Sequence, residues 1–399
     1  MEPKKKILFV NYNMIVGGST TSLLSLLSGI DKNSYDVSLQ LYKNEGPLLP
    51  LIPDEVRLLP EAALFNGKYG TIRKYIRFIF SGFLMRALRA NRRIGKNGFS
   101  EQIMSDFQVQ RLSRRENGKY DFAVGFLEGW ADRYVSLRTH AGRKYGWLHA
   151  EFDRIAPIPE LEHPWMDKMT KIVNVSEKCN DDFKRAFPDM AAKAICCENI
   201  MDSGIVRRRA AEDLSADPEY TMLLESKLFK IITVCRLDIA HKGLDRAAQC
   251  AARLKKDGYR FLWIIVGDGA GRAELERLTR ENDIADCFRL IGARANPYPF
   301  VRLCDIFCMP SRWEGKPISV TESMMLAVPP VVTEYRSAKE QISDGIDGLI
   351  AKNDDTAITE QVCFCLDNPE KVVEMKRNLK KRDYGNRNTV REIEAALFS

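Results

Sequence analysis

The stretch Cys304–Glu334 constrains the fold of this chain more than any other part of the sequence. It opens with an apolar run that ends at Met309, passes through a polar turn that contains Glu314, and continues as a helical segment that Pro329 terminates. This order predicts a strand, a loop and a helix, with the loop at the carboxyl end of the strand, where open parallel α/β sheets bind their ligands. Pro317 suits the first turn of the helix, whose free backbone amides favour a phosphate or another anion.

Two carboxylates, Glu314 in the loop and Glu322 on the helix, frame this predicted anion site. Carboxylates are unlikely partners for phosphates, because both groups are negatively charged, but they accept hydrogen bonds from hydroxyl groups. The pair therefore suits the sugar and the ribose of a nucleotide sugar.

Glu314, seven intervening residues and Glu322 resemble the E-x7-E motif of retaining glycosyltransferases with the GT-B fold, in particular glycosyltransferase family 4 (group 1). Three further stretches agree with this family in order and spacing: VCRLDIAHKGLDRA (Val234–Ala247), IIVGDGAGRAELERL (Ile264–Leu278) and FRLIGA (Phe288–Ala293). The resemblance is strong from about residue 229 to 351 and patchy before that. It implies an α/β protein of GT-B architecture, in which two Rossmann-like domains face a cleft.

The length of 399 residues also favours two domains. We expect an N-terminal Rossmann-like acceptor-side domain at residues 1–200 and a C-terminal Rossmann-like domain that binds the nucleotide sugar at residues 201–385. The polar segment Met201–Lys227 is interpreted as the linker between them plus one helix. The resemblance further implies that a last helix, within residues 386–399, returns to the N-terminal domain.

Apolar runs predict the strands of both domains. In the first domain they lie at Lys6–Tyr12, Tyr35–Tyr42, Val56–Leu59, Phe122–Leu127, Lys144–His149, Lys171–Val175 and Ala194–Asn199. In the second domain they lie at Phe229–Cys235, Phe261–Val266, Phe288–Ile291, Asp305–Met309 and Pro330–Thr333. Strands that alternate with helices predict parallel sheets covered on both faces.

Positive charge is concentrated in one segment. Residues 66–120 hold 13 lysines and arginines against three acids, whereas the whole chain has a net charge of +7. Within this segment, Thr71–Arg93 has the pattern of a helix with an apolar side and a basic side. Such a helix suits an anionic membrane surface, although Gly82 weakens it, and the alternative is a helix packed on its own domain with a solvated basic face. Nucleic-acid binding is not expected, because no recognised nucleic-acid module accompanies the charge.

The sequence predicts a cytoplasmic protein, peripheral on the inner face of the cell membrane. It contains no run of about 18 apolar residues, and the apolar run in MEPKKKILFVNY is too short for a signal peptide. All ten cysteines lie from Cys179 onward without a C-x-x-C pair, so we expect reduced thiols in the core. Four scattered histidines make a histidine-based metal site improbable.

Two regions of the first domain are candidate ligand contacts. The turn Met14–Thr21 leads into a predicted helix at Ser22–Gly29, and Gly17 and Gly18 let backbone amides approach a ligand closely. A tight strand-to-helix turn explains this pattern equally well, but the resemblance implies contact with the donor phosphates and the acceptor. His149 ends its predicted strand, and the resemblance implies an acceptor-side or donor-contact role that places it among the catalytic candidates.

Arg236 and Lys242 are the candidates for binding the diphosphate. Arg236 ends a predicted buried strand, and Lys242 precedes Gly243 at the predicted start of the next helix. Two fixed cations there can stabilise the negative charge that develops on a leaving diphosphate. The resemblance implies this role for both cations. It also implies that Glu314 binds hydroxyls of the donor sugar and that Glu322 binds hydroxyls of the ribose.

The remaining donor-binding candidates supply backbone groups or a hydroxyl: Gly292, Ala293, Arg294, Lys316, Pro317, Ile318 and Ser319. The first three are expected at the nucleobase and the last four around the sugar and the phosphates, although Pro317 has no N–H to donate. Many members of the family carry an aromatic residue and a glycine at the positions of Lys316 and Pro317. This departure leaves the identity of the sugar open.

The resemblance implies a retaining hexosyltransferase that moves a sugar from a UDP- or GDP-sugar to a hydroxyl acceptor without a metal or another cofactor. The basic segment suggests a lipid-linked saccharide acceptor, as in the assembly of bacterial surface polysaccharides or glycolipids. A glycoside hydrolase would leave Arg236 and Lys242 without a role, and GDGAG at Gly267–Gly271 lacks the third spacing of a dinucleotide-binding motif. A nucleotide-sugar epimerase and a noncatalytic nucleotide-sugar-binding partner of another transferase stay open as alternatives.

Overall fold

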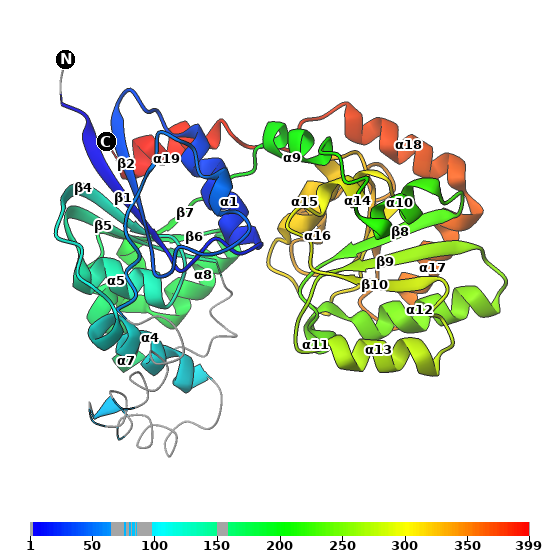
Figure 1. Cartoon of the computed structure of the whole chain (residues 1–399), viewed down its shortest axis with the longest axis horizontal. Coiled ribbons are helices and arrows are strands. Elements are labelled where there is room, and N and C mark those ends of the chain that lie inside the picture. The colour runs from blue at the N-terminus through cyan, green and yellow to red at the C-terminus, as the bar shows by residue number, and fades with distance from the viewer. Residues whose placement is uncertain are drawn as a thin grey trace. The chain divides into compact units, whose positions relative to one another are not determined.

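The computed structural model describes residues 3–64, 76, 80, 82–83, 85, 98–149 and 159–398. The chain forms two compact units (Figure 1). The first unit comprises Met1–Met201 and Arg387–Ser399, and the second comprises Asp202–Asn386.

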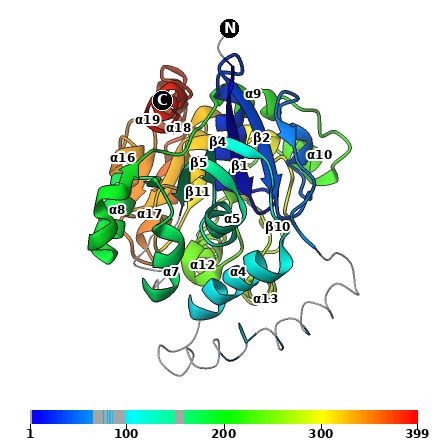
Figure 2. The same ribbon diagram turned by 90° about the vertical axis from the view of Figure 1, so that its left-hand side faces the viewer.

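The described part of the first unit contains a seven-stranded sheet in the order β3-β2-β1-β4-β5-β6-β7, and all of its paired strands are parallel. Figure 2 shows β2, β1, β4 and β5 of this sheet. The strands are β1 (Lys5–Asn11), β2 (Tyr35–Leu41), β3 (Arg57–Leu58), β4 (Lys119–Gly125), β5 (His140–Leu148), β6 (Lys171–Asn174) and β7 (Ala194–Cys196). The helices are α1 (Gly18–Gly29), α4 (Gly98–Leu112), α5 (Trp130–Arg138), α7 (Pro159–Met166), α8 (Glu177–Ala186) and α19 (Thr389–Leu397), with 3-10 turns at Leu49–Leu51 and Pro188–Lys193.

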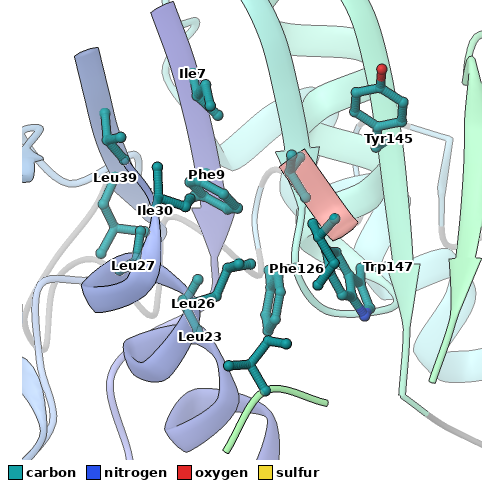
Figure 3. Packing of buried hydrophobic residues seen from close by; sticks show 14 of the residues in the cluster. Ile7, Phe9, Leu23, Leu26, Leu27, Ile30, Leu39, Phe126, Tyr145 and Trp147 are labelled. Carbon is teal, nitrogen blue, oxygen red and sulfur yellow. The ribbon is translucent and has the colours of Figure 1, made fainter. Parts of the chain in front are cut away.

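Both faces of the first sheet are buried. Alternate residues of a strand point to opposite faces, so Ile7 and Phe9 of β1 join one core cluster whereas Leu8 and Val10 join the other. Figure 3 shows the first cluster, in which leucines of α1 pack against Phe9. The second cluster contains residues of α4, α5 and α7.

The last helix of the chain, α19, packs on the first unit. Its residues Val390, Ile393 and Leu397 belong to the same core cluster as β1. The ring of Phe398 is fully buried, with its centroid 6.3 Å from that of Phe9 and 5.3 Å from that of Phe122. Apolar burial therefore holds the chain end against the strands of this unit.

The second unit contains a six-stranded parallel sheet in the order β10-β9-β8-β11-β12-β13. Its strands are β8 (Phe229–Val234), β9 (Phe261–Val266), β10 (Phe288–Gly292), β11 (Ile306–Met309), β12 (Pro330–Thr333) and β13 (Leu349–Ala351). Its helices are α9 (Ser203–Ala210), α10 (Pro218–Glu225), α11 (Ile239–Lys242), α12 (Leu244–Lys256), α13 (Arg272–Glu281), α14 (Tyr298–Arg302), α15 (Ile318–Met325), α16 (Ala338–Gln341), α17 (Ala357–Asp367) and α18 (Pro369–Lys380). Helices α12, α13 and α17 pack on one face, and α10, α14 and α15 pack on the other (Figure 1).

Each predicted strand has a counterpart in the structure, although β4 and β5 begin three and four residues before their predicted starts. The short strand β13 was not predicted. Met201–Lys227 was wrongly predicted to hold a linker and one helix, since it contains both α9 and α10. Asp202 and Asp217 begin these helices by accepting hydrogen bonds from the backbone amides of the first turn.

The predicted basic helix Thr71–Arg93 lies largely outside the described residues. Of its described residues, Ile76 and Phe80 are 50% and 85% exposed, whereas Phe83 is buried. Gly82 has a φ of 76°, a left-handed conformation that interrupts a regular helix. The three apolar residues, although spaced for one helix face, therefore differ in exposure. No helix within the described residues combines the length and the apolar character needed to cross a membrane.

Each sheet has a point at which the strand order reverses. In the first sheet β1 lies between β2 and β4, and in the second β8 lies between β9 and β11. Loops that leave neighbouring strands at such a point diverge to opposite faces of the sheet, and the crevice between them is where open α/β sheets bind ligands.

Candidate functional site

The loops that follow β8 and β11 bring together a cation and a carboxylate that lie far apart in the sequence. Lys242, at the end of α11, donates from Nζ to Oε1 of Glu314 at 2.7 Å. Ser311 donates from Oγ to the same oxygen at 2.6 Å. The strand pairing that places Ile231 of β8 beside Ile306 of β11 brings these loops close to one another.

A glycine permits the close contact between the two loops. Gly243, directly after Lys242, has a φ of 61°, and a Cβ atom there would lie 2.1 Å from the carbonyl oxygen of Pro310. Glycine relieves both the backbone strain and the clash. Asp238 begins α11 by accepting a hydrogen bond from the backbone N–H of His241 at 3.1 Å.

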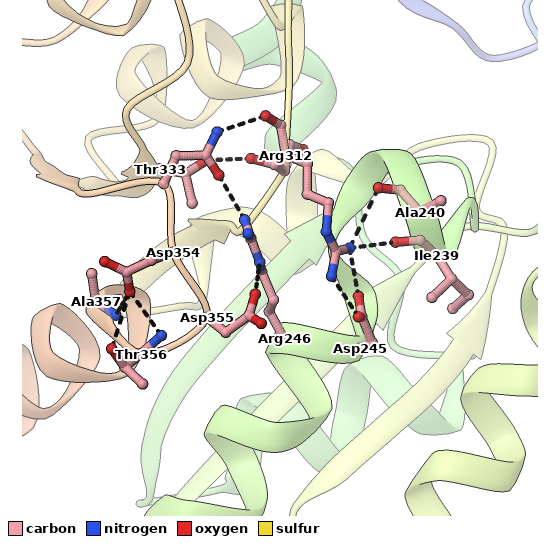
Figure 4. Close-up of polar contacts among 12 residues, drawn as sticks. Ile239, Ala240, Asp245, Arg246, Arg312, Thr333, Asp354, Asp355, Thr356 and Ala357 are labelled. Atoms are coloured by element: carbon pink, nitrogen blue, oxygen red, sulfur yellow. Dashed lines mark hydrogen bonds and ion pairs between the residues drawn. The ribbon is translucent and has the colours of Figure 1, made fainter.

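Arg312 fixes the loop that carries Glu314. Its guanidinium donates to the carboxylate of Asp245 at 2.9 and 2.7 Å and to the carbonyl oxygens of Ile239 and Ala240 (Figure 4). A two-point contact between arginine and a carboxylate is among the stronger polar contacts in proteins. The loop is therefore held against α11 and α12 before any ligand binds.

Glu314 is a buried carboxylate with three polar neighbours. Its side chain is 7% exposed, and that of Lys242 is 15% exposed. Burial by itself would raise the pKa of Glu314, but His241, Lys242 and Ser311 outweigh burial and hold this pKa below its usual value. Glu314 is consequently ionised at neutral pH, and Lys242 neutralises its charge.

Arg236 lies in the loop between β8 and α11, and its side chain is exposed. Within the described ranges, this side chain makes no hydrogen bond or ion pair with another residue. Arg236 is thus an exposed cation in the loop that precedes α11, the helix that ends with Lys242.

Glu322, the second carboxylate of the predicted pair, lies on α15 in a different environment. Tyr298 donates from its hydroxyl to Oε1 of Glu322 at 2.6 Å. Burial raises the pKa of Glu322, and the hydrogen bond from Tyr298 and the charge of Arg209 oppose this shift. The two acids of the motif therefore differ: a cation neutralises Glu314, whereas Glu322 has a neutral hydroxyl partner.

Four predicted site residues, Lys316, Pro317, Ile318 and Ser319, lie together at the amino end of α15, which begins at Ile318. Neighbouring side chains hold this approach to the helix. Gln341 donates from Nε2 to the carbonyl oxygen of Pro317 at 3.0 Å. A side chain of α16 therefore helps to hold the loop that leads into α15.

The predicted nucleobase contacts lie at the end of β10. Gly292 has a φ of 78°, and its carbonyl oxygen accepts a hydrogen bond from the N–H of Gly267 at 3.0 Å. Ala293 follows, and the side chain of Arg294 donates to Asp217 at 2.9 Å. The Arg294 side chain already has a protein partner, so backbone groups are the candidates for contacting a ligand at this position.

The glycines of GDGAG have a structural explanation. Gly267 has a φ of 151°, and a Cβ atom there would lie 1.8 Å from the carbonyl oxygen of Cys235. The loop is bonded to the segment after β8, since Leu237 donates from its N–H to the carbonyl oxygen of Asp268 at 3.0 Å. The glycines allow this close backbone packing.

In the first unit, Gly17 and Gly18 lie at the start of α1. Gly17 has an extended backbone, and a Cβ atom there would have no other atom of the described residues within 4 Å. Neither the backbone conformation nor a contact within the described part of the chain therefore explains a glycine at Gly17. The exposed side chains of Ile15 and Val16 precede it.

His149 follows β5 and is held in its neutral form. Burial lowers the pKa of His149 to about 4, although the carbonyl of Phe126 and the side chain of Asn199 favour the charged ring. The backbone N–H of His149 donates to Oε2 of Glu128 at 2.9 Å. Burial also raises the pKa of Glu128.

Sequence reasoning missed several polar residues near these positions. Glu128 follows β4, and Asn11 and Asn174 end β1 and β6 with buried side-chain oxygens that have no partner among the described residues. The two asparagines could have been predicted from the sequence, because each is a polar residue at the end of an apolar strand. His241 was not among the predicted site residues, because its neighbours Trp313 and Glu314 belong to a loop that is distant in the sequence.

Residues 222–382 match the family model described as glycosyl transferases group 1. This segment is therefore similar to the group 1 glycosyltransferases. Among curated relatives, the amylovoran biosynthesis glycosyltransferase AmsK of Erwinia amylovora is 30% identical over 134 residues, which are 32% of this chain and 33% of the relative. An N-acetylgalactosaminyltransferase of Campylobacter jejuni, whose name specifies an acceptor linked to diphospho-undecaprenol, is 28% identical over 177 residues, 44% of each chain. The chain thus spans less than half the length of these relatives.

Solved structures resemble the chain over nearly its whole length. HepE of Anabaena in complex with UDP and glucose has a TM-score of 0.69 and 15% identity, and the match covers 99% of this chain and 100% of HepE. WaaG, a glycosyltransferase involved in lipopolysaccharide biosynthesis, has a TM-score of 0.61 and 13% identity, with 98% and 99% covered. At such low identity these matches show the fold, and they confirm the predicted α/β class of GT-B architecture.

The segment that matches the group 1 model contains most of the predicted site residues. It brings together Lys242 and Glu314 by direct contact, and it places Arg236 in the same loop region. Within the described residues, no cluster of three or more His, Cys, Asp or Glu side chains is arranged to hold a metal ion.

Proposed function

We propose that this chain is a retaining, metal-independent glycosyltransferase of the family 4 type that transfers a hexose or related sugar from a UDP- or GDP-sugar to a hydroxyl acceptor. The observation that carries the proposal is the Lys242–Glu314–Ser311 cluster at the carboxyl edge of the second sheet. This cluster lies within the segment that matches the group 1 model. UDP complexes of a structural neighbour support the choice of donor class.

The residues of the second unit take the donor-binding roles. Arg236 and Lys242 stabilise the negative charge that grows on the diphosphate as its bond to the anomeric carbon breaks. Glu314 accepts hydrogen bonds from hydroxyls of the sugar, and Glu322 accepts them from the ribose. The free amides at the start of α15 favour the anionic phosphates.

The first unit takes the acceptor side. Gly17 and Gly18 are proposed contacts of the donor phosphates and the acceptor, and neutral His149 is proposed to form a hydrogen bond with the acceptor or the donor sugar. In a front-side displacement, the acceptor oxygen bonds to the anomeric carbon on the face that the diphosphate leaves. The acceptor proton passes to the leaving phosphate. The sugar therefore keeps its anomeric configuration, and the two cations perform the charge stabilisation that a metal would otherwise supply.

The first test is thermal unfolding in EDTA with UDP, GDP, ADP and their common sugars. A ligand at one hundred times its Kd adds about 2.7 kcal/mol, which raises the melting temperature of a unit of this size by about 5–10 °C. Arg236→Ala and Glu322→Ala should abolish the shift, whereas Arg260→Ala, at an exposed position away from the site, should retain it.

Activity separates the proposed transferase from its alternatives. Transfer to an acceptor with an unchanged anomeric configuration, seen by proton NMR, is the expected result. Conversion of the nucleotide sugar without an acceptor would favour an epimerase, and binding without any conversion would favour a noncatalytic partner subunit. Absence of binding to every nucleotide would contradict all three nucleotide-sugar functions.

We further propose a lipid-linked saccharide acceptor, in bacterial surface polysaccharide or glycolipid assembly, and a location on the cytoplasmic face of the membrane. The name of the Campylobacter relative specifies an acceptor linked to diphospho-undecaprenol, and the name of a Salmonella typhi relative specifies polysaccharide biosynthesis. The basic segment 66–120 suits an anionic membrane surface, and so do the exposed apolar side chains of Ile76 and Phe80.

Sedimentation with anionic liposomes tests the membrane proposal. The protein should bind, and a variant with four arginines of residues 71–93 changed to Glu should not: Arg86, Arg89, Arg92 and Arg93. A matched control reverses four exposed basic residues of the second unit: Lys256, Arg260, Arg280 and Lys381. Equal binding by both variants would show that overall charge, rather than this segment, causes association.

A further inference from the structure

His241 occupies a fixed position beside the carboxylate of Glu314. Its ring stacks on that of Trp313, with centroids 5.1 Å apart and planes inclined by 7°. Its Nε2 atom lies 3.7 Å from Oε2 of Glu314. Because Trp313 directly precedes Glu314, a single loop determines both the plane of the imidazole and the position of the carboxylate.

The two oxygens of Glu314 differ in their partners. Oε1 accepts hydrogen bonds from Lys242 at 2.7 Å and from Ser311 at 2.6 Å. Oε2 faces His241 at a separation that is too long for a direct hydrogen bond. Oε2 therefore retains the capacity to accept a hydrogen bond from a ligand.

A hydroxyl group fits the separation between His241 and Oε2. An oxygen atom about 2.8 Å from each of two polar atoms bridges a gap of this length. A hydroxyl both accepts and donates, so it can accept from Nε2–H and donate to Oε2 at the same time. Neutral imidazole with its proton on Nε2 and the charged ring both supply the required N–H.

We propose that His241 Nε2 and Glu314 Oε2 together bind one hydroxyl group of the donor sugar. This inference rests on the proposed function and adds to it a sugar-contacting residue, His241, that selects for a hydroxyl at one ring position. Lys242 and Ser311 hold the carboxylate in place through its other oxygen, and Trp313 holds the imidazole. A sugar that lacks the hydroxyl leaves both polar groups without their partner.

Isothermal titration with UDP and with UDP-glucose compares binding of the nucleotide with binding of the sugar. If GDP is the nucleotide that stabilises the wild type, GDP and GDP-mannose replace them. His241→Ala should weaken the affinity for the nucleotide sugar by about five- to tenfold, which corresponds to the loss of one hydrogen bond. It should change the affinity for the bare nucleotide by less than about twofold. His241→Gln, which keeps an N–H donor, should recover part of the loss.

Analogues with one sugar hydroxyl at a time replaced by fluorine identify the hydroxyl. One analogue should bind the wild type about five- to tenfold more weakly, and that same analogue should lose little further affinity in His241→Ala, because the residue and the hydroxyl form one interaction. His140→Ala, a change at an exposed histidine of the first unit, is the control and should behave as the wild type.

The inference is overturned if His241→Ala weakens the affinity for the bare nucleotide as much as the affinity for the nucleotide sugar. His241 would then act on the phosphates or on the fold. Independent, additive losses for every fluorinated analogue in His241→Ala would overturn it as well. If the wild type binds no nucleotide at all, the proposed function fails and the inference fails with it. Melting temperatures of all variants separate these results from unfolding.

Discussion

Replacement of Lys242 by methionine tests whether this lysine compensates a buried charge. Methionine keeps an unbranched side chain of similar length but removes the ammonium group that lies 2.7 Å from Glu314. Removal of one partner of a buried ion pair costs about 3–5 kcal/mol, because the other charge is left buried. We expect the lower end, about 3 kcal/mol, since Ser311 and His241 still contact the carboxylate. For a unit of this size the melting temperature should fall by about 6–12 °C.

The pH dependence of this effect has a defined sign. In the wild type the pKa of folded Glu314 lies below its usual value, so ionisation of Glu314 stabilises the fold above the unfolded pKa, and this stability is lost as the pH falls through the folded pKa. In Lys242→Met, burial is no longer offset by the lysine, and the pKa of Glu314 should rise. The loss of stability should therefore be largest at neutral pH and should shrink as the carboxyl takes up a proton at lower pH.

Scanning calorimetry at a series of pH values measures these shifts. Lys242→Met combined with Glu314→Gln should melt closer to the wild type at neutral pH than Lys242→Met alone, because a neutral amide needs no counter-charge. Lys255→Met is the matched control: Lys255 pairs with the exposed Asp286 at 2.9 Å, and loss of an exposed pair costs about 0–1 kcal/mol. The reasoning is refuted if the single and double variants melt together, or if the loss in Lys242→Met does not depend on pH.

Three further predictions concern the positions that shape the site and the core. Gly243→Ala should cost about 2 kcal/mol or more, since its Cβ would meet Pro310, whereas Gly258→Ala, also at positive φ but in open space, should cost about 1 kcal/mol; equal losses in thermal unfolding would contradict this. Glu322→Gln should raise the melting temperature relative to the wild type, and the gain should be larger at pH 8 than at pH 5. The pKa of folded Glu322 is raised, so its ionisation destabilises the fold as the pH rises. A gain that is larger at pH 5 would mean that the pKa of folded Glu322 is lowered instead. Phe398→Ala should destabilise the first unit by about 3 kcal/mol or more, because the ring is fully buried; calorimetry showing a change below about 2 °C would mean that the chain end contributes little.

The sequence by itself determined the strands and the class of the fold. Apolar runs bounded by turn residues located β8, β9 and β11 closely, because a strand buried on both faces must be apolar along its whole length. The sequence also identified Glu314, Glu322, Arg236 and Lys242 as site candidates through their motif. Periodicity was less reliable where a single glycine changed the backbone: Gly82, at positive φ, lies between exposed Phe80 and buried Phe83.

Only the tertiary structure decided which side chains meet. Lys242 and Glu314 contact one another because β8 pairs with β11 rather than with β10, and no local pattern encodes that order of strands. The same pairing gives His241 its partners Trp313 and Glu314, which sequence reasoning could not supply. Burial acts to raise the pKa of both acids of the motif, but His241, Lys242 and Ser311 outweigh it at Glu314, so the pKa of Glu314 is lowered whereas that of Glu322 is raised. Local sequence fixes the alternation of apolar and polar residues, whereas the ionisation and partners of a buried group depend on residues that come near only after the sheet has formed.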